Sequence, residues 1–210
     1  MDGARYTFNG KGEFTILETD DNSFVVQGRL EQATDESGMP VQATVFTAIV
    51  AKTNTSDVVQ LEVNGAGDGI EVRVNRALLN FSILSSQRFV GVEVTQQVDN
   101  TYQASFGGNY VVQVSGENGI LSLLRVAPPA EAMRRTRGLL GNFNGDPSDD
   151  LIPRMASEPI PATSTLEEIH NQFGLTCEFS LILRSILTLK EGECREGRVT
   201  LKEGSAGREG

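Results

Sequence analysis

A cluster of oxygen-bearing side chains falls within one short stretch near residue 145 of the 210-residue sequence. Residues 138–150 read Gly-Leu-Leu-Gly-Asn-Phe-Asn-Gly-Asp-Pro-Ser-Asp-Asp. Carboxylate and amide oxygens are hard ligands suited to Ca²⁺, which takes about 6–8 oxygens at about 2.3–2.6 Å in flexible geometry. The stretch contains no Cys or His, which disfavours zinc and copper. The candidate calcium ligands within it are Asn142, Asn144, Asp146, Asp149 and Asp150.

The glycines of this stretch favour a tightly folded loop. Gly141 and Gly145 permit the left-handed turns that wrapping a single ion requires, and Phe143 between them is a candidate inward anchor. The spacing is not that of an EF-hand, because Pro147 and Pro153 stand where that motif needs Gly and Glu. Clusters of Asn, Asp, Gly and Pro are also common as plain turns, so composition alone leaves both interpretations open.

Composition restricts the classes of partner. The chain carries 18 Lys and Arg against 28 Asp and Glu, a net charge of −10. Nucleic-acid binding and attachment to anionic membranes normally require a basic surface, so neither is expected. No apolar run approaches the 18 or so residues that span a bilayer, so we expect no membrane insertion by this segment.

The elements that must position the loop are predominantly strands. Short runs rich in Val, Ile, Phe and Thr alternate with Gly, Asn and Asp at intervals typical of a sandwich or barrel. The pattern predicts a mainly β fold, an antiparallel β-sandwich with one or two short helices near the C-terminal end. Hairpin turns are expected at residues 64–69 and 107–109. The predicted strands cover residues 14–17, 23–30, 43–51, 58–63, 70–74, 102–106, 110–114 and 120–126.

Helical signals occur only late in the chain. Residues 130–135 are compatible with a short helical turn. Residues 164–167, Ser-Thr-Leu-Glu, fit a capping box. The helix that follows places Leu166, Ile169, His170 and Phe173 on one face, and Gly174 is a natural residue to follow its end.

Catalysis is not expected. His170 is the only histidine and has no Ser or Cys partner motif. Asp149 and Asp150 are adjacent in sequence, and adjacent carboxyl groups rarely reach the roughly 5–9 Å opposed geometry of a glycosidase. A metal ligand or turn role is favoured for both.

Two further sets of residues carry possible chemistry. Asn54-Thr55-Ser56 and Asn80-Phe81-Ser82 match the N-glycosylation pattern, which also arises by chance. Cys177 and Cys194 could pair with each other, pair outside the chain or belong to a misread end of the sequence. Met1 leads directly into a strand pattern, so we expect the sequence to be a fragment of a longer chain.

Two motifs in this order resemble the von Willebrand factor type D (VWD) family. The late motif is residues 137–150, and the opening motif is residues 2–14, Asp-Gly-Ala-Arg-Tyr-Thr-Phe-Asn-Gly-Lys-Gly-Glu-Phe. Leu140 stands where many members carry a cysteine. The sequence therefore resembles the cysteine-poor form found in mucin-like and sushi-domain cell-surface proteins. The likeness predicts a VWD-like domain over residues 1–176, with its calcium loop at 138–150, followed by a divergent, disordered tail over 177–210.

The resemblance implies a structural Ca²⁺ that joins the chain's opening to the late loop. Its ligands would be carboxylates of Asp2, Asp149 and Asp150, side-chain oxygens of Asn142 and Asn144, and the main-chain carbonyl of Asp146. The implied protein is an extracellular adhesion module, a glycoprotein that is either secreted or on the outer side of a membrane-anchored chain. Its partners would be neighbouring extracellular domains and cell-surface or matrix proteins. The alternative is a secreted calcium-dependent protein that binds or processes glycans.

Overall fold

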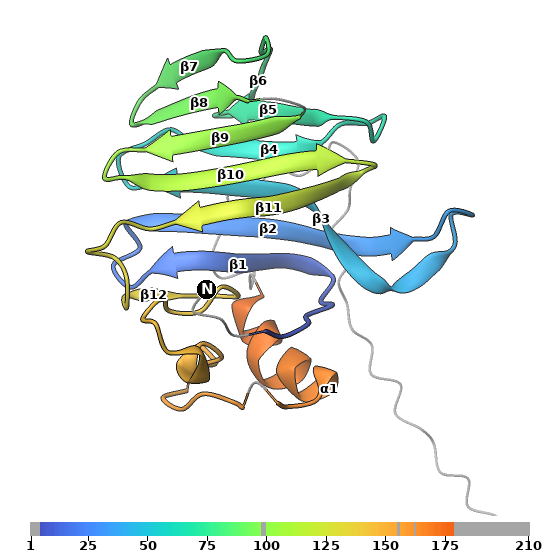
Figure 1. Cartoon of the computed structure of the whole chain (residues 1–210), viewed down its shortest axis with the longest axis vertical. Helices are drawn as coiled ribbons and strands as arrows, with labels where there is room; N and C mark the ends of the chain where they lie inside the picture. Colours follow the sequence, from blue (N-terminus) through green and yellow to red (C-terminus); the bar gives the residue numbers. More distant parts are fainter. Residues whose placement is uncertain (1–4, 98–99, 155, 162, 179–210) are drawn as a thin grey trace, which may run out of the picture.

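The computed structural model of the chain describes residues 5–97, 100–154, 156–161 and 163–178. These residues form antiparallel strands paired into one curled sheet, with short helical segments near the C-terminal end (Figure 1). The predicted mainly β, sandwich-like class is therefore confirmed. The strands are β1 (Gly12–Thr19), β2 (Phe24–Thr34), β3 (Pro40–Thr53), β4 (Val59–Val63), β5 (Ile70–Val74), β6 (Ala77–Leu79), β7 (Ser86–Phe89), β8 (Val92–Gln96), β9 (Thr101–Phe106), β10 (Tyr110–Glu117), β11 (Ile120–Ala127) and β12 (Thr136–Arg137).

The long strand β3 makes the sheet fold over on itself. Its first half meets β11 at Phe46, whereas its second half pairs with β4 from Ala48 to Ala51. One branch continues through β11, β10, β9 and β8 to β7, and the other continues through β4 and β5 to β6. The first branch lies in front of the second in Figure 1, which gives the two layers of a sandwich. Both predicted hairpins, β4–β5 and β9–β10, are present.

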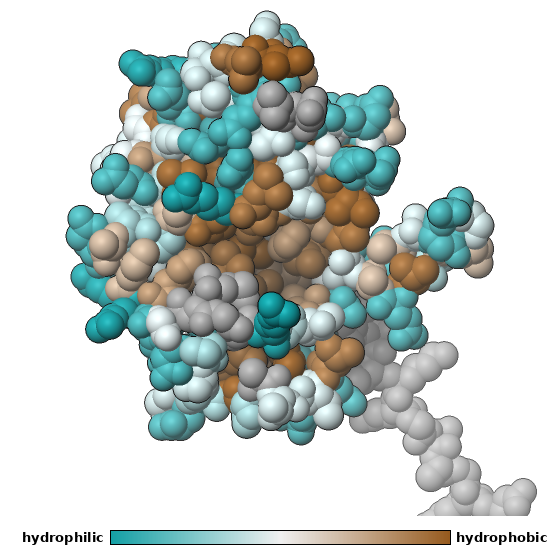
Figure 2. Space-filling view, viewed as in Figure 1, coloured by the Kyte–Doolittle hydropathy of each residue, from teal (hydrophilic) through white to brown (hydrophobic). Residues whose placement is uncertain are grey.

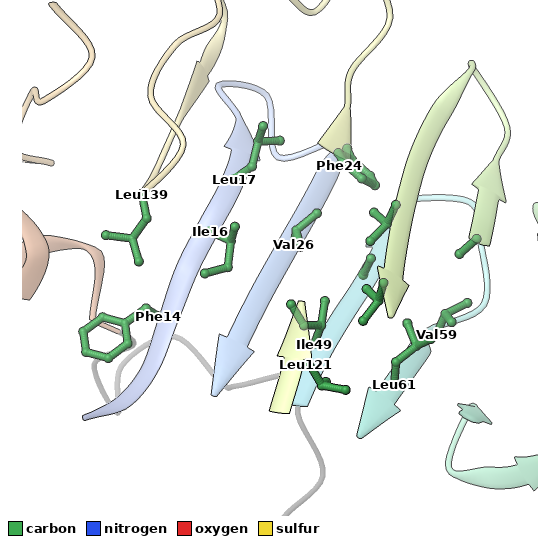
Figure 3. Packing of buried hydrophobic residues seen from close by; sticks show 14 of the residues in the cluster. Phe14, Ile16, Leu17, Phe24, Val26, Ile49, Val59, Leu61, Leu121 and Leu139 are labelled. Atoms are coloured by element: carbon green, nitrogen blue, oxygen red, sulfur yellow. The ribbon is translucent and has the colours of Figure 1, made fainter. Parts of the chain in front are cut away.

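The core fills the space between these layers. Phe14, Phe24 and Leu61, from the layer that contains β1, β2 and β4, are at most 1% exposed, and they belong to one cluster with Val94 and Val112 of the layer that contains β8 and β10. The Phe24 ring also stacks on Tyr110 at 4.4 Å between centroids. Figure 3 shows part of this packing, with Leu139 of the late loop beside β1. Apolar burial of this kind is the main favourable contribution to the stability of the fold.

The other face of the layer that contains β1, β2, β4 and β5 carries paired charges. The register places Arg29 opposite Ala48, and Ala48 opposite Glu62. Because Ala48 has only a methyl side chain, the Arg29 guanidinium can pass over β3 and donate to the Glu62 carboxylate at 3.2 Å. A second donation at 3.1 Å reaches Glu13 on β1, and Arg73 on β5 donates to Glu62 from the other side at 3.4 Å. This ion-pair row links β1, β2, β4 and β5.

Four strands were not predicted from the sequence. Strands β6, β7 and β12 are only two to four residues long, and β8 follows β7 through a tight turn at Val90 and Gly91. None of them has a long apolar alternation that would reveal it in the sequence. Each forms because it pairs with a longer neighbouring strand. Residues 130–134 form hydrogen-bonded turns, in which the Met133 amide donates to the Pro129 carbonyl at 3.3 Å, and these turns do not extend into a helix.

The C-terminal helix begins one residue later than predicted. Thr165 caps the first turn, α1 (Leu166–Glu168), accepting from the Glu168 amide, while the Glu168 carboxylate accepts from the Thr165 amide. The chain continues through a π segment (Ile169–Phe173) and a 3₁₀ segment (Gly174–Cys177). A cap at Ser164 and a cap at Thr165 both match the capping pattern. The observed cap at Thr165 is the one with which Ile169 and Phe173 are buried. No helix in the described part of the chain is long and apolar enough to cross a bilayer.

Gly174 does not follow the end of the helix, as was expected, but begins the 3₁₀ segment that continues it. Its φ and ψ are −57° and −45°, ordinary helical values. A Cβ at this position would lie 2.0 Å from Cε2 of Phe8. The glycine is therefore needed for close approach, because the Phe8 ring packs directly on the helix and stacks on His170 at 5.4 Å.

Candidate calcium site

The late loop is built on the free edge of β1. Strand β12 pairs with the end of β1, and the next residues continue along the same edge. The Leu139 amide donates to the Thr15 carbonyl at 3.1 Å, and the Leu140 amide donates to the Ile16 carbonyl at 2.9 Å. Figure 3 shows the Leu139 side chain near Phe14 and Ile16. The first half of the loop is thus fixed by sheet-like hydrogen bonds and by the core.

The opening segment of the chain reaches the same place. The Tyr6 hydroxyl donates to the Leu139 carbonyl, and the Tyr6 ring packs edge-on against Phe173 at 5.7 Å. Burial raises the pKa of Tyr6 strongly, and the nearby Cys177 and Asp150 add to the effect. Tyr6 therefore remains a neutral donor. Contacts more than 130 residues apart in sequence join the start of the domain to the loop.

An ion-pair cluster fastens the chain on either side of the loop. Glu18 on β1 has a side chain only 7% exposed and pairs with both Arg137 and Arg154. Arg137 precedes the oxygen-rich residues and Arg154 follows them. One carboxylate thus anchors both ends of the loop. This pairing was not predicted, because nothing local in the sequence links Arg137 to Glu18.

Within the loop, Asn142 connects the two acidic side chains. Its backbone amide donates to Oδ1 of Asp150 at 3.2 Å, and its side-chain amide donates to Oδ1 of Asp149 at 2.9 Å. The Asn144 side-chain amide donates to the other Asp149 oxygen at 2.7 Å. Four of the residues singled out from the sequence therefore lie together. The Oδ1 atoms of Asn142 and Asn144 accept from the backbone amides two residues on, at 3.1 and 2.6 Å.

Gly141 holds the loop close to Asp150. Gly141 has φ +76° and Gly145 has φ +89°, so both adopt the predicted left-handed conformation. A Cβ on Gly141 would lie 2.1 Å from Oδ1 of Asp150, which is itself only 3% exposed. Phe143 packs against the core, as its proposed anchor role requires. The backbone thus approaches a buried carboxylate as closely as only a glycine allows.

The remaining candidate ligands differ from these four. The Asp146 carboxylate points into its own turn and accepts from the Ser148 amide and hydroxyl at 2.9 and 2.6 Å. These hydrogen bonds lower the pKa of Asp146. The ligand role implied for Asp146 uses its main-chain carbonyl, which this side-chain arrangement does not involve. Asp2 lies outside the described residues.

The described residues do not by themselves form a cluster of acidic, His or Cys side chains around one point. Within residues 5–97, 100–154, 156–161 and 163–178, no three Asp, Glu, His or Cys side chains cluster closely enough to hold a metal ion. The loop does offer two carboxylates beside two amides, an oxygen-rich donor set of the kind that Ca²⁺ prefers. Asp149 and Asp150 both accept hydrogen bonds from Asn142, so a cation that contacted both carboxylates would be electrostatically favoured.

Cys177 lines a small cavity with Arg137 and Gly138 at the start of the loop and provides a test of the packing there. It is 4% exposed and not disulfide-bonded, and burial raises its pKa to about 11. We expect Cys177 in the folded, reduced chain to resist iodoacetamide at pH 8, because the thiolate is the reactive form. Peptide mass spectrometry after labelling with and without urea measures this. Rapid labelling of Cys177 without urea would contradict the described packing.

The fold and loop together define a class of protein: an all-β module whose late acidic loop closes back onto its first strand. A sequence profile of the von Willebrand factor type D domain matches residues 1–156. The chain is 30% identical to human sushi domain-containing protein 2 over 80% of its length and 31% identical to the Bombyx mori protein mesh over 71%. It is also 30% identical to human mucin-4 over 86% of its length.

The chain belongs to the von Willebrand factor type D family. It spans 20% of the sushi-domain relative, 10% of mesh and 3% of human mucin-4. It thus corresponds to a small part of each of these larger proteins.

Proposed function

We propose that the chain is an extracellular structural module of an adhesion or assembly protein and that its late loop binds one Ca²⁺. The main support is that Asp149 and Asp150 both contact Asn142, next to Gly141, where a Cβ would clash with Asp150. Membership of the VWD family supports the extracellular setting. The relatives, a mucin, a sushi-domain protein and mesh, are multidomain extracellular proteins.

The proposed ligands are those implied by the family. The carboxylates of Asp149 and Asp150, the side-chain oxygens of Asn142 and Asn144, and the Asp146 carbonyl would contribute from the loop. Asp2 would contribute from the opening segment. Tyr6, four residues later, contacts Leu139, which supports the idea that the opening and the loop share one site. Side-chain oxygens of both Asn residues would have to exchange their present backbone partners for the ion.

In the proposed mechanism, the ion stabilises the folded domain. Bound Ca²⁺ would neutralise the paired carboxylates. The protein's own residues supply the frame: Leu139 and Leu140 hold the loop on β1, and Glu18 holds Arg137 and Arg154. An ion that binds only the folded chain stabilises it by mass action. The domain would then be more rigid in a calcium-rich extracellular medium than without the ion.

We propose no catalytic role. His170 stacks on Phe8, which suits a packing function. The cavity beside the loop, lined by Thr15, Glu18 and Arg137 among others, has a volume of about 10 Å³. A space of that size admits one water molecule. These features favour a structural site over the alternative of calcium-dependent glycan binding or processing. The partners would be neighbouring domains of the same chain and other cell-surface or matrix proteins.

Calorimetric melting with calcium and with chelator tests the calcium proposal. At a free calcium concentration about a hundredfold above Kd, binding adds about 2.7 kcal/mol, which corresponds to a rise of about 5–10 °C for a chain of this size. We expect Asp150→Ala to abolish the rise.

Asp35→Ala serves as the control. Like Asp146, Asp35 begins an Asp-x-Ser turn, but this turn lies at the tip of the β2–β3 hairpin, where Asp35 accepts from Ser37 and Met39. This variant should keep the full calcium-dependent rise. If calcium leaves the melting temperature of the wild-type chain unchanged, the proposed site is refuted, regardless of the results for the variants.

A further inference from the structure

The two branches of the sheet end close together in sequence at an apolar turn. Strand β6 pairs only with β5, and β7 is the last strand of its branch. The segment between them exposes Ile83 and Leu84 by 66% and 74%, and Leu78 on β6 is 55% exposed. Figure 2 shows apolar surface at the end of the molecule where Figure 1 places β6 and β7. Free strand edges beside exposed apolar side chains favour self-association.

The turn holds these apolar side chains in a fixed position. The Ser85 amide donates to the Ser82 carbonyl at 3.0 Å, and the Ser82 amide donates to the Ser85 hydroxyl at 3.0 Å. Leu84 has φ +62°, a left-handed value that is uncommon for a residue with a large side chain. The exposure of Ile83 and Leu84 is therefore built into a closed, hydrogen-bonded turn.

The N-glycosylation pattern Asn80-Phe81-Ser82 lies at the start of this turn. Phe81 anchors the segment by packing edge-on against Tyr102 at 5.6 Å, while Asn80 and Ser82 are both exposed. The Asn80 carbonyl accepts from the Gln87 side chain at 2.7 Å, which fixes the backbone without using the Asn80 side chain. Within the described structure, no hydrogen bond engages the Asn80 side-chain amide or the Ser82 hydroxyl.

We propose that Asn80 carries an N-linked glycan that covers the apolar turn at Ile83 and Leu84. In the transfer step, Nδ2 of Asn80 forms a bond to the anomeric carbon of a lipid-pyrophosphate oligosaccharide. The bond from that carbon to the pyrophosphate oxygen breaks, and Nδ2 loses one proton. The inference rests on the extracellular setting of the proposed function, because only chains in the secretory pathway meet this donor. The sugars would shield the turn and hinder pairing at the edges of β6 and β7.

The second pattern, Asn54-Thr55-Ser56, lies in a different environment. The Ser56 hydroxyl accepts from the Thr53 amide at 2.8 Å and donates to the Asp57 carbonyl at 3.0 Å, so it is part of the β3–β4 turn. This turn packs against Gly91, where a Cβ would lie 2.8 Å from the Thr55 carbonyl. The Ser56 hydroxyl of this pattern is therefore engaged in the folded turn, whereas, within the described residues, that of Ser82 is not, so we assign the modification to Asn80 alone.

Expression of the full chain behind a secretion leader in eukaryotic cells tests the assignment. The protein is recovered from the medium and from the membrane fraction. Its intact mass and its peptides are measured by mass spectrometry before and after a peptide amidase removes N-glycans. We expect one glycan, lost completely in Asn80→Gln and in Ser82→Ala. Ser82→Thr keeps the pattern and should keep the glycan. Asn54→Gln should also leave it unchanged.

Self-association provides the second measurement. Enzymatic removal of the glycan from the folded chain should raise the average mass in analytical ultracentrifugation, and Ile83→Ser with Leu84→Ser should suppress that rise. An unmodified Asn80 in chains that have entered the secretory pathway would overturn the inference, as would a glycan on Asn54 alone. Neither result depends on calcium, so the inference and the calcium site can fail separately.

Discussion

Replacing Gly141 by alanine should destabilise the domain by about 2–5 kcal/mol. The substitution combines a left-handed φ of +76°, which costs about 1–2 kcal/mol in a residue with a side chain, with overpacking against Asp150, which typically costs about 1–3 kcal/mol. The new Cβ would lie 2.1 Å from a buried carboxylate oxygen, so Asp150 must move. Urea unfolding followed by circular dichroism, in calcium and in chelator, measures the free energy of unfolding.

Gly145 supplies a control in the same loop. Its φ is +89°, yet nothing lies within 4 Å of the position that a Cβ would take. Gly145→Ala therefore carries the conformational cost alone, about 1–2 kcal/mol. Because Gly141→Ala also displaces Asp150, it should reduce the stabilisation by calcium, whereas Gly145→Ala should retain most of it. Equal losses for the two variants would show that the approach of Gly141 to Asp150 is unimportant.

Replacing Arg29 by leucine should cost about 3–5 kcal/mol, the usual loss when one partner of a buried ion pair is removed. The Arg29 side chain is 7% exposed and contacts Glu13 and Glu62, whose side chains are 20% and 4% exposed. Without the guanidinium, the Glu62 carboxylate remains buried with Arg73 as a neighbouring charge at 3.4 Å. Thermal and urea unfolding of the variant measure the loss.

Two comparisons separate the loss of this ion pair from a general effect of removing an arginine. Arg88 is 83% exposed and pairs with Glu93, so Arg88→Leu should change stability by less than about 1 kcal/mol. The double variant Arg29→Leu with Glu62→Leu should recover much of the single-variant loss, because no buried carboxylate is then left behind. A double variant as unstable as the sum of both singles would argue against direct coupling.

The sequence predicted those parts of the fold that depend on local pattern. The apolar alternation of β1 to β5 and β9 to β11 and the glycine-rich turns between them are encoded within short windows. The helix was also found, but its start was one residue off, because Ser164 and Thr165 both satisfy the capping pattern. What decides between them is the burial of Ile169 and Phe173, which depends on the rest of the fold. Gly174 was misjudged for a similar reason, since Phe8 packs against it.

The candidate site shows the same division. Gly141, Gly145 and the cluster around Asn142 could be proposed from the sequence, because they lie within nine positions of one another. The pairing of Glu18 with Arg154 joins residues 136 apart, and that of Arg29 with Glu62 passes over the small side chain of Ala48. No periodicity or spacing encodes such contacts. They depend on strand register, which only the folded sheet reveals.

Titration of the metal-free chain with Ca²⁺ by isothermal calorimetry tests the central proposal most directly. We expect one ion per chain, a loss of binding in Asp149→Asn and in Asp150→Asn, and unchanged binding in Asp35→Asn. Failure of the folded wild-type chain to bind calcium would contradict it, as would binding that persists at full strength in both loop variants.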